Sequence, residues 1–291
     1  MEPFRFEIPK NLDQVYEIIG NTNGEVRPLA GGTDLIDQIR QGRRNPSVVV
    51  DMKRIPELNR LDWEPNIGLH IGAATSCARV YEDETVNEYY PAIADSSRLI
   101  GSIQIQNRAA LGGNVCNGVP SADTVPSLLV YETKAVIGGP RGQREVPLEE
   151  FFLAPGKTVL DADEILIELL IPQPPVNSYS HYLRFIPREE MDIAVAGVAS
   201  FVALKESGDC DKVRIALASV APTPVCATQA EVILTGQSPS YDLLEEASEK
   251  AVVHANPIND VRGTIEYRRD LVRVLTRRTL IRCFQHLGVD L

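Results

Sequence analysis

Two short glycine-rich segments are the clearest candidates for chemistry in this sequence. In residues 28–35, Gly31 and Gly32 join a predicted strand to a predicted helix, and in residues 108–114, Gly112 and Gly113 form a second predicted corner. Glycine reaches positive φ and lets a ligand approach the main chain closely. Free N–H groups in such a corner, beside a helix N-terminus, suit a phosphate or pyrophosphate. The two segments therefore predict loops that bind an anion.

Polar side chains follow each glycine pair. Thr33 could donate a hydroxyl hydrogen bond, and Asp34 could cap the next helix or accept a bond from a ribose hydroxyl. Neither segment matches the G-x-G-x-x-G dinucleotide pattern or the G-x-x-x-x-G-K-[ST] phosphate pattern. Paired glycines are also common in tight turns. The residues alone thus leave the ligand unspecified.

The metal-ligating residue types are scattered along the chain. No two cysteines are spaced as C-x-x-C, and no two histidines lie four residues apart; the residues are Cys77, Cys116, Cys210, Cys226, Cys283, His70, His181, His254 and His286. This pattern does not predict a zinc or iron–sulfur site. We expect no metal in this chain and no catalytic side chain, so its chemistry requires an organic cofactor or none.

The composition is that of a globular chain with an acidic surface. The 291 residues are 44% hydrophobic and 24% charged, and 29 basic against 40 acidic residues give a net charge of −11. Such a balance argues against sequence-independent binding to nucleic acid. The N-terminus has no signal-peptide pattern, and no apolar run approaches the ~20 residues of a membrane span. These features predict a cytoplasmic protein with free thiols.

Hydrophobic periodicity divides the chain into two parts. In the first, we expect helices at 12–19, 35–40, 91–99 and 125–131, and strands at 26–29, 47–51, 67–71, 134–138 and 165–171. Pro172, Pro174 and Pro175 then predict a linker, because proline cannot continue a helix or a central strand. Beyond it we expect antiparallel strands at 179–186, 194–204 and 212–220, followed by helices at 243–254 and 264–286. The fold class is α+β.

Several motifs occur together in a specific order. They are Ala-Gly-Gly-Thr-Asp-Leu at 30–35, Ile-Gly-Ala-Ala-Thr at 71–75, Gln-Asn-Arg-Ala-Ala-Leu-Gly-Gly-Asn at 106–114 and Pro-Ser-Ala-Asp-Thr-Val-Pro at 120–126. In this order they resemble the FAD-binding medium subunit of the molybdenum hydroxylases. That family includes xanthine dehydrogenase, aerobic carbon monoxide dehydrogenase and nicotinate-type dehydrogenases. Residues 188–195 resemble the start of its C-terminal domain, so the likeness covers essentially the whole chain.

The resemblance implies a specific organisation of the chain. Residues 1–175 would form a two-part FAD-binding domain of the PCMH (vanillyl-alcohol-oxidase-like) type, with a subdomain boundary near 55–60. Residues 176–291 would form a smaller C-terminal flavoprotein domain with an antiparallel sheet and helices.

The resemblance also assigns the residues expected to bind FAD. The first loop would surround the pyrophosphate with Leu29, Ala30, Gly31, Gly32, Thr33, Asp34 and Leu35. The second diphosphate loop would consist of Ala110, Leu111, Gly112, Gly113 and Asn114. Asp123 would bond a ribose or a flavin group, or alternatively cap a helix at 124–131. Ile100 stands where xanthine dehydrogenases tend to place an aromatic residue beside the isoalloxazine, so a stacking partner is lost there.

The implied function is electron transfer. A large subunit would hold the molybdenum cofactor, a small subunit would hold [2Fe–2S] clusters, and electrons would pass through FAD on this chain to NAD, oxygen or a quinone. The complex would be a dimer of heterotrimers. Two alternatives remain open at this point. One is a stand-alone FAD-dependent oxidase or dehydrogenase, and the other is a non-enzymatic nucleotide-binding module.

Arginines are concentrated in the last predicted helix and the residues before it: Arg262, Arg268, Arg269, Arg273, Arg277, Arg278 and Arg282. One interpretation is a solvated face with salt bridges to nearby acids. The other is a docking surface for an acidic partner subunit.

Overall fold

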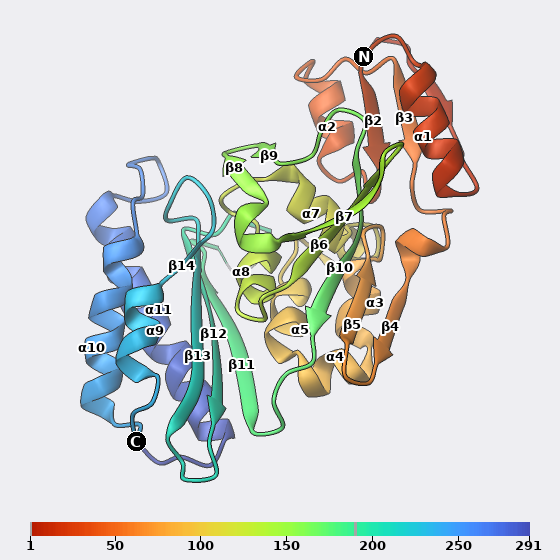
Figure 1. The fold of residues 1–291 in the computed structure, drawn as a ribbon. Coiled ribbons are helices and arrows are strands. Elements are labelled where there is room, and N and C mark those ends of the chain that lie inside the picture. The colour runs from red at the N-terminus through yellow and green to blue at the C-terminus, as the bar shows by residue number, and fades with distance from the viewer. Residues whose placement is uncertain (1, 189–190) are drawn as a thin grey trace.

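The computed structural model describes residues 2–188 and 191–291. Three larger sheets follow one another along the chain, with helices packed between and around them (Figure 1). The first lies near the N-terminus, the second at the centre of the molecule, and the third in the C-terminal part.

The N-terminal sheet is parallel, with strand order β1-β3-β2. Its elements in chain order are β1 (Arg5–Glu7), α1 (Leu12–Asn21), β2 (Val26–Leu29), α2 (Leu35–Arg40) and β3 (Val48–Asp51). Parallel neighbours need a crossover connection, and α1 and α2 provide the two crossovers. The run Val48–Val50 is fully buried because β3 is the central strand.

The middle sheet is antiparallel, with order β4-β5-β10-β6-β7. Its strands are β4 (Leu61–Glu64), β5 (Gly68–Gly72), β6 (Lys134–Gly139), β7 (Gly142–Pro147) and β10 (Ile165–Pro172). The central strand β10 is therefore the last of the five in sequence. Its side chains alternate between two cores: Ile165 and Ile167 pack with the N-terminal sheet, and Leu166 and Leu169 pack with the middle helices.

Short elements connect the strands of the middle sheet. They are η1 (Glu57–Asn59), α3 (Cys77–Glu82), α4 (Glu84–Tyr89), α5 (Pro91–Arg98), α6 (Ile103–Gln106), α7 (Leu111–Asn117), α8 (Thr124–Leu129), η2 (Leu148–Glu150), β8 (Phe152–Ala154) and β9 (Lys157–Thr158). The β8–β9 hairpin touches the end of α7, where the Gly156 N–H donates to the Gly118 carbonyl at 2.9 Å.

The C-terminal sheet is antiparallel, with order β11-β12-β13-β14. Its elements are β11 (Ser178–Phe185), β12 (Ala196–Leu204), β13 (Cys210–Ala218), β14 (Val225–Cys226), α9 (Thr228–Leu234), α10 (Tyr241–Ala251), η3 (Val252–His254) and α11 (Ile265–His286). Helices α9–α11 cover one face, and α5 and α8 of the middle part cover the other (Figure 1). All nine residues of β12 are buried because both faces of the sheet are covered.

The longer predicted elements agree with the structure to within about three residues at each end. Strand β10 runs through Pro172, so the linker begins one residue later than predicted. Pro172 is tolerated there because it forms the last pair of the β10–β5 ladder, opposite Gly68. Within the described residues, no helix is both long and apolar enough to cross a membrane.

Candidate cofactor-binding site

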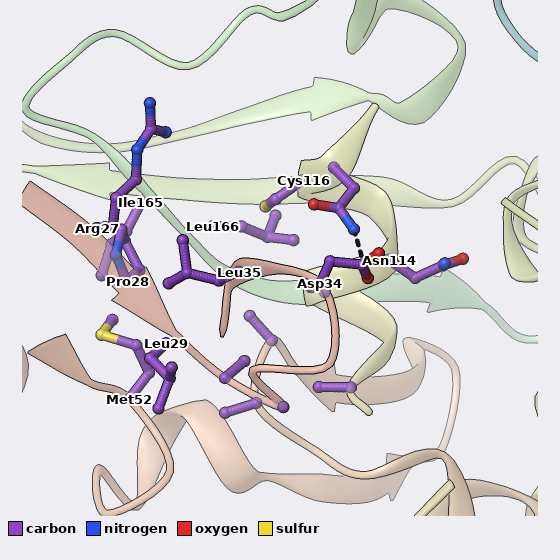
Figure 2. Close-up of a pocket in the computed structure, with 18 of the residues that line it drawn as sticks. Arg27, Pro28, Leu29, Asp34, Leu35, Met52, Asn114, Cys116, Ile165 and Leu166 are labelled. Carbon is purple, nitrogen blue, oxygen red and sulfur yellow. Dashed lines mark hydrogen bonds between the residues drawn. The ribbon is translucent and has the colours of Figure 1, made fainter. Parts of the chain in front are cut away.

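A cavity of about 650 Å³ lies between the N-terminal sheet and the middle helices. Three chain segments contribute most of its wall: residues 26–35, residues 109–117 and residues 156–166. Figure 2 shows side chains from all three segments around the cavity, among them Leu35, Cys116 and Leu166. The two glycine-rich segments predicted from sequence thus meet at one site.

The first glycine pair is required by close packing and by backbone conformation. A Cβ on Gly31 would lie 2.6 Å from the Arg108 carbonyl oxygen and 2.7 Å from Ala109 Cα. Gly32 has φ +76°, in the left-handed region that favours glycine. Gly31 therefore lets the first loop rest directly on the second, and Gly32 turns the chain into α2.

The second glycine pair does not form a corner, so that prediction is wrong. Gly112 and Gly113 lie in the first turn of α7, and neither has positive φ. A Cβ on Gly112 would lie 2.5 Å from Ala73 Cα and from its carbonyl oxygen, so α7 packs closely on this chain segment. A Cβ on Gly113 would meet only Ala30 Cβ, at 3.8 Å. Packing therefore does not require glycine at position 113. The missing side chain of Gly113 instead leaves the cavity wall open at this point.

Main-chain donors surround this open wall. The N–H groups of residues 31–35 and of residues 112–113 donate to no acceptor within the part of the chain that the structure describes. Each is a strong donor that a folded protein normally pairs. Two sets of donors from two loops in contact make a site for a group with several acceptor oxygens, such as a pyrophosphate.

Two polar side chains at the site are held by other parts of the protein. Asp34 precedes α2 but makes no capping bond; its carboxylate accepts a hydrogen bond from Asn117 Nδ2 at 2.8 Å. Asn114 Oδ1 accepts a bond from the Thr124 hydroxyl at 2.7 Å. These bonds fix α2 to the end of α7 and α7 to the start of α8. Figure 2 shows the bond to Asp34 as a dashed line.

Most of the residues predicted from sequence line the cavity. They are Leu29, Ala30, Gly31, Gly32, Thr33, Asp34, Leu35, Ile100, Ala110, Gly112, Gly113 and Asn114. The side chain of Leu111 does not; it is fully buried in the core of the middle part. The prediction that Leu111 contributes to the cavity therefore has no support from the lining residues.

Asp123 also lies away from the cavity lining. Its carboxylate accepts bonds from the Tyr182 hydroxyl at 2.7 Å and from Arg184 at 2.5 Å, both on β11 of the C-terminal sheet. Its side chain makes no capping hydrogen bond to α8, so the alternative prediction of a helix cap is wrong. Burial raises the pKa of Asp123, and the Arg184 charge opposes that shift. In this structure Asp123 connects the middle and C-terminal parts, and direct contact with a cofactor has no support from the cavity.

The sequence prediction missed one complete wall and a group of arginines. Residues 156–166 line the cavity although they carry no glycine pair or other recognisable motif. Arg27, Arg43 and Arg44 line it too. The adjacent pair Arg43-Arg44 after a short helix was the only sequence signal for this basic group. The pair Arg43-Arg44 lies near Arg27 on β2 because β2 pairs in parallel with β3.

Two cysteines at the cavity have unreactive thiols. Cys77 and Cys116 both line it, and burial raises the pKa of each thiol to about 12. A thiol with such a pKa stays protonated at neutral pH and is a poor nucleophile. Neither residue therefore supplies covalent catalysis.

Comparison with known proteins assigns this chain to a family. Residues 2–174 match the family described as the FAD binding domain in molybdopterin dehydrogenase, and residues 181–283 match the CO dehydrogenase flavoprotein C-terminal domain. The chain belongs to this flavoprotein family. The predicted α+β fold, an FAD-binding domain followed by a C-terminal domain, is thereby confirmed.

Relatives match this flavoprotein over nearly their whole length. It is 32% identical to the putative xanthine dehydrogenase FAD-binding subunit of Escherichia coli (strain K12), over 89% of this chain and 88% of the relative. It is 28% identical to the carbon monoxide dehydrogenase medium chain of Hydrogenophaga pseudoflava, over 95% and 96%. A solved structure of carbon monoxide dehydrogenase from that organism superposes with a TM-score of 0.93 at 28% identity, covering 98% of this chain and 99% of that one.

The residues at the cavity fit the cofactor of the flavoprotein family. A volume of about 650 Å³ is within the ~300–1,000 Å³ typical of small-molecule sites. The unbonded N–H groups can donate to a pyrophosphate, and Gly113 leaves room beside them. Apolar side chains such as Leu29, Met52 and Leu166 can contact flat ring systems.

Proposed function

We propose that this chain binds FAD in the cavity and transfers electrons within a multi-subunit molybdenum hydroxylase. The observation that carries the proposal is the meeting of two glycine segments whose main-chain donors face one cavity and lack acceptors within the described chain. Family membership supports FAD as the ligand. When bound, FAD would supply the capacity to accept electrons from one partner and deliver them to another.

The protein's own contribution is to bind and orient the cofactor. Residues 29–35, Ala110 and residues 112–114 would hold the pyrophosphate, with Ile100 as an apolar contact for a ring. Side chains with acid–base function are not needed for this task. The relatives support an oxidoreductase subunit over the two alternatives, a stand-alone oxidase and a nucleotide-binding module.

The partners and the organisation of the chain are part of the proposal. We infer a molybdopterin-binding large subunit and a [2Fe–2S] small subunit, since relatives are named as medium chains or subunits of complexes. A dimer of heterotrimers, an acceptor among NAD, oxygen or a quinone, and a cytoplasmic location complete the proposal. The family matches at 2–174 and 181–283 support domains at 1–175 and 176–291, and the break between the first two sheets supports a subdomain boundary near 55–60.

Cofactor identity tests the proposal directly. The full chain is purified, incubated with FAD and passed over a gel-filtration column, and bound material is then released by denaturation and identified by chromatography. We expect about one FAD per chain and much weaker retention of FMN, which lacks the adenylate and the pyrophosphate. A chain that elutes without flavin absorbance, or that retains a different nucleotide, contradicts the proposal.

Co-purification tests the partners. The native complex is isolated by a tag on this chain, and the associated polypeptides and metals are identified. We expect molybdenum and iron in the complex, carried by other polypeptides. A chain that purifies alone and oxidises a small organic substrate would instead support the stand-alone oxidase.

A further inference from the structure

One wall of the cavity is a segment without regular structure that carries two carboxylates. Residues 159–164 run between β9 and β10, and Asp161 and Glu164 both line the cavity. If a dianionic pyrophosphate binds in the same cavity, as proposed above, unneutralised carboxylates on its wall would oppose it. The segment must therefore be held in place and neutralised by groups from outside it.

Arg144 on β7 makes the contacts that meet both requirements. Its Nε donates to Glu164 Oε1 at 2.9 Å, and its Nη2 donates to Glu164 Oε2 at 2.7 Å. The same Nη2 donates to the Val159 carbonyl at 2.9 Å. One guanidinium thus bonds both ends of the segment, in the two-point geometry that arginine and carboxylate favour.

Glu164 transmits this contact to the rest of the segment. Its Oε2 also accepts a hydrogen bond from the Asp161 N–H at 2.9 Å, and its side chain is only 9% exposed. The Arg144 hydrogen bond lowers the pKa of Glu164 to about 2, so this carboxylate is charged at every physiological pH. A nearby arginine at the same hairpin, Arg141, pairs with Asp161 and Asp163 at 2.7–3.1 Å.

We propose that Arg144 is a positioning residue for FAD, which acts by neutralising Glu164 and holding the 159–164 wall in place. The inference rests on the proposed function, because it assigns Arg144 a role toward the ligand of that cavity. Arg144 does not itself line the cavity, and its effect on the cofactor passes through Glu164.

The test measures FAD dissociation constants for four full-length proteins by flavin fluorescence. They are the wild type, Arg144→Met, Glu164→Gln and the double variant that combines them. We expect Arg144→Met to weaken FAD binding about tenfold near neutral pH, because a charged and mostly buried Glu164 is left without its partner. Removing that charge in the double variant should return the affinity to within about threefold of the wild type.

The pH dependence supplies a second, independent readout. Without Arg144, the pKa of Glu164 should rise toward its ordinary value, because burial still raises it and only the Asp161 N–H bond and the Arg141 charge still lower it; acidification should then neutralise Glu164. FAD affinity of Arg144→Met should then improve as the pH falls from about 7.5 to about 5, while that of the wild type should not follow this trend. Arg144→Lys keeps the positive charge but cannot donate to both carboxylate oxygens at once. This variant should therefore lose less affinity for FAD than Arg144→Met.

A control variant removes a solvent-exposed ion pair from the same hairpin. Lys134 Nζ and Glu145 Oε2 are 2.9 Å apart and about half exposed, away from the cavity wall. Lys134→Met should leave FAD affinity unchanged. Wild-type affinity in Arg144→Met overturns the role of Arg144 while leaving the proposed function intact. A loss that persists undiminished in the double variant overturns the neutralisation of Glu164 as its cause. Failure of the wild type to bind FAD overturns both.

Discussion

At the scale of single residues, the four glycines at this site have three different reasons to be glycine. Gly31 and Gly112 avoid clashes with neighbouring main chain, Gly32 adopts positive φ, and Gly113 leaves the cavity wall open. The sequence shows only two identical pairs. The difference between Gly112 and Gly113 depends on Ala73 and Ala30, which are distant in sequence and close in space.

Gly112 and Gly113 therefore make a matched pair for mutation. Gly113→Ala should leave the free energy of unfolding unchanged or raise it by up to about 1 kcal/mol, because alanine is the better helix former and its Cβ meets no atom closer than 3.8 Å. It should nevertheless weaken FAD binding, since the new methyl group lies on the cavity wall. Chemical denaturation without cofactor and FAD titration measure the two effects separately.

Gly112→Ala should instead lower the free energy of unfolding of the cofactor-free protein. Its Cβ would lie 2.5 Å from Ala73, and relieving such overpacking typically costs about 1–3 kcal/mol of unfolding free energy. Equal destabilisation by the two substitutions would contradict the distinction drawn between the two glycines.

Glu164 also predicts a specific dependence of stability on acid. Its pKa falls from an ordinary value of 4.5 to about 2 on folding, mainly through the Arg144 hydrogen bond. The stabilisation from a group with a lowered pKa is fully present above the unfolded value and is lost as the pH falls toward the folded value. The stability difference between wild type and Glu164→Gln should therefore shrink as the pH drops from about 5 to about 3. Urea titrations across this range measure it, and a difference that grows on acidification would contradict the assignment.

At the scale of elements, α11 shows that its arginines have more than one role. Arg268 is 4% exposed and donates to the Val195 and Ser219 carbonyls and to Asp260. Arg273 and Arg277 pair with acids of α10. The interpretation as a solvated face with salt bridges agrees with Arg273 and Arg277. Arg268 also pairs with an acid, but it is buried and joins two loops to the start of the helix.

Replacing Arg268 should therefore be costly. Arg268→Met removes the donor to the Val195 and Ser219 carbonyls, and each buried acceptor left without a hydrogen bond typically costs about 1–3 kcal/mol. Arg269→Ala, at the neighbouring exposed position, should change stability by no more than about 0.5 kcal/mol. Thermal and urea denaturation compare the two variants; similar small effects at both positions would show that Arg268 is not a structural contact.

Sequence reasoning recovered the long elements and some short ones, such as the helix at 35–40, but missed several short helices for a physical reason. The helix at 264–286 and the strand at 194–204 have enough periodic residues to define a face. The helices α3, α4 and α6 have only four to six residues each, too few to show a period. Both loops of the candidate site were readable because their glycines and polar residues lie close together in sequence. The third wall, at 156–166, was not, because only the placement of β10 beside β5 and β6 brings it to the cavity.

At the scale of the whole molecule, the C-terminal sheet belongs to two cores at once. Ala199, Phe201 and Ala203 of β12 pack into the core of the middle part, while Val198 and Val202 pack against the C-terminal helices. Phe201 meets the ring of Tyr131 edge-on, with centroids 5.4 Å apart. The linker at 173–175 therefore separates two sequence segments that share a continuous packed interior.

This shared core predicts cooperative unfolding. Trp63, the only tryptophan, lies on β4 of the middle sheet and reports on that sheet alone. Phe201→Ala, in the C-terminal sheet, should destabilise the protein by about 3–5 kcal/mol and should lower the denaturation midpoint seen by Trp63 fluorescence as much as that seen by circular dichroism. Leu153→Ala, at a side chain 66% exposed, should shift neither. A Trp63 transition unaffected by Phe201→Ala would show that the two parts unfold separately.

The position of β10 has a consequence for how the protein is made. β10 occupies the centre of the middle sheet and supplies Ile165 and Leu166 to the cavity, yet it is the last strand of that sheet to be synthesised. Until it emerges from the ribosome, β5 and β6 have no strand between them, and the cavity lacks one wall. Both glycine segments are translated well before that moment. The nascent chain thus carries both glycine segments before it has a pocket. If the cavity binds the cofactor as proposed, capture must wait until more than half of the polypeptide has been translated.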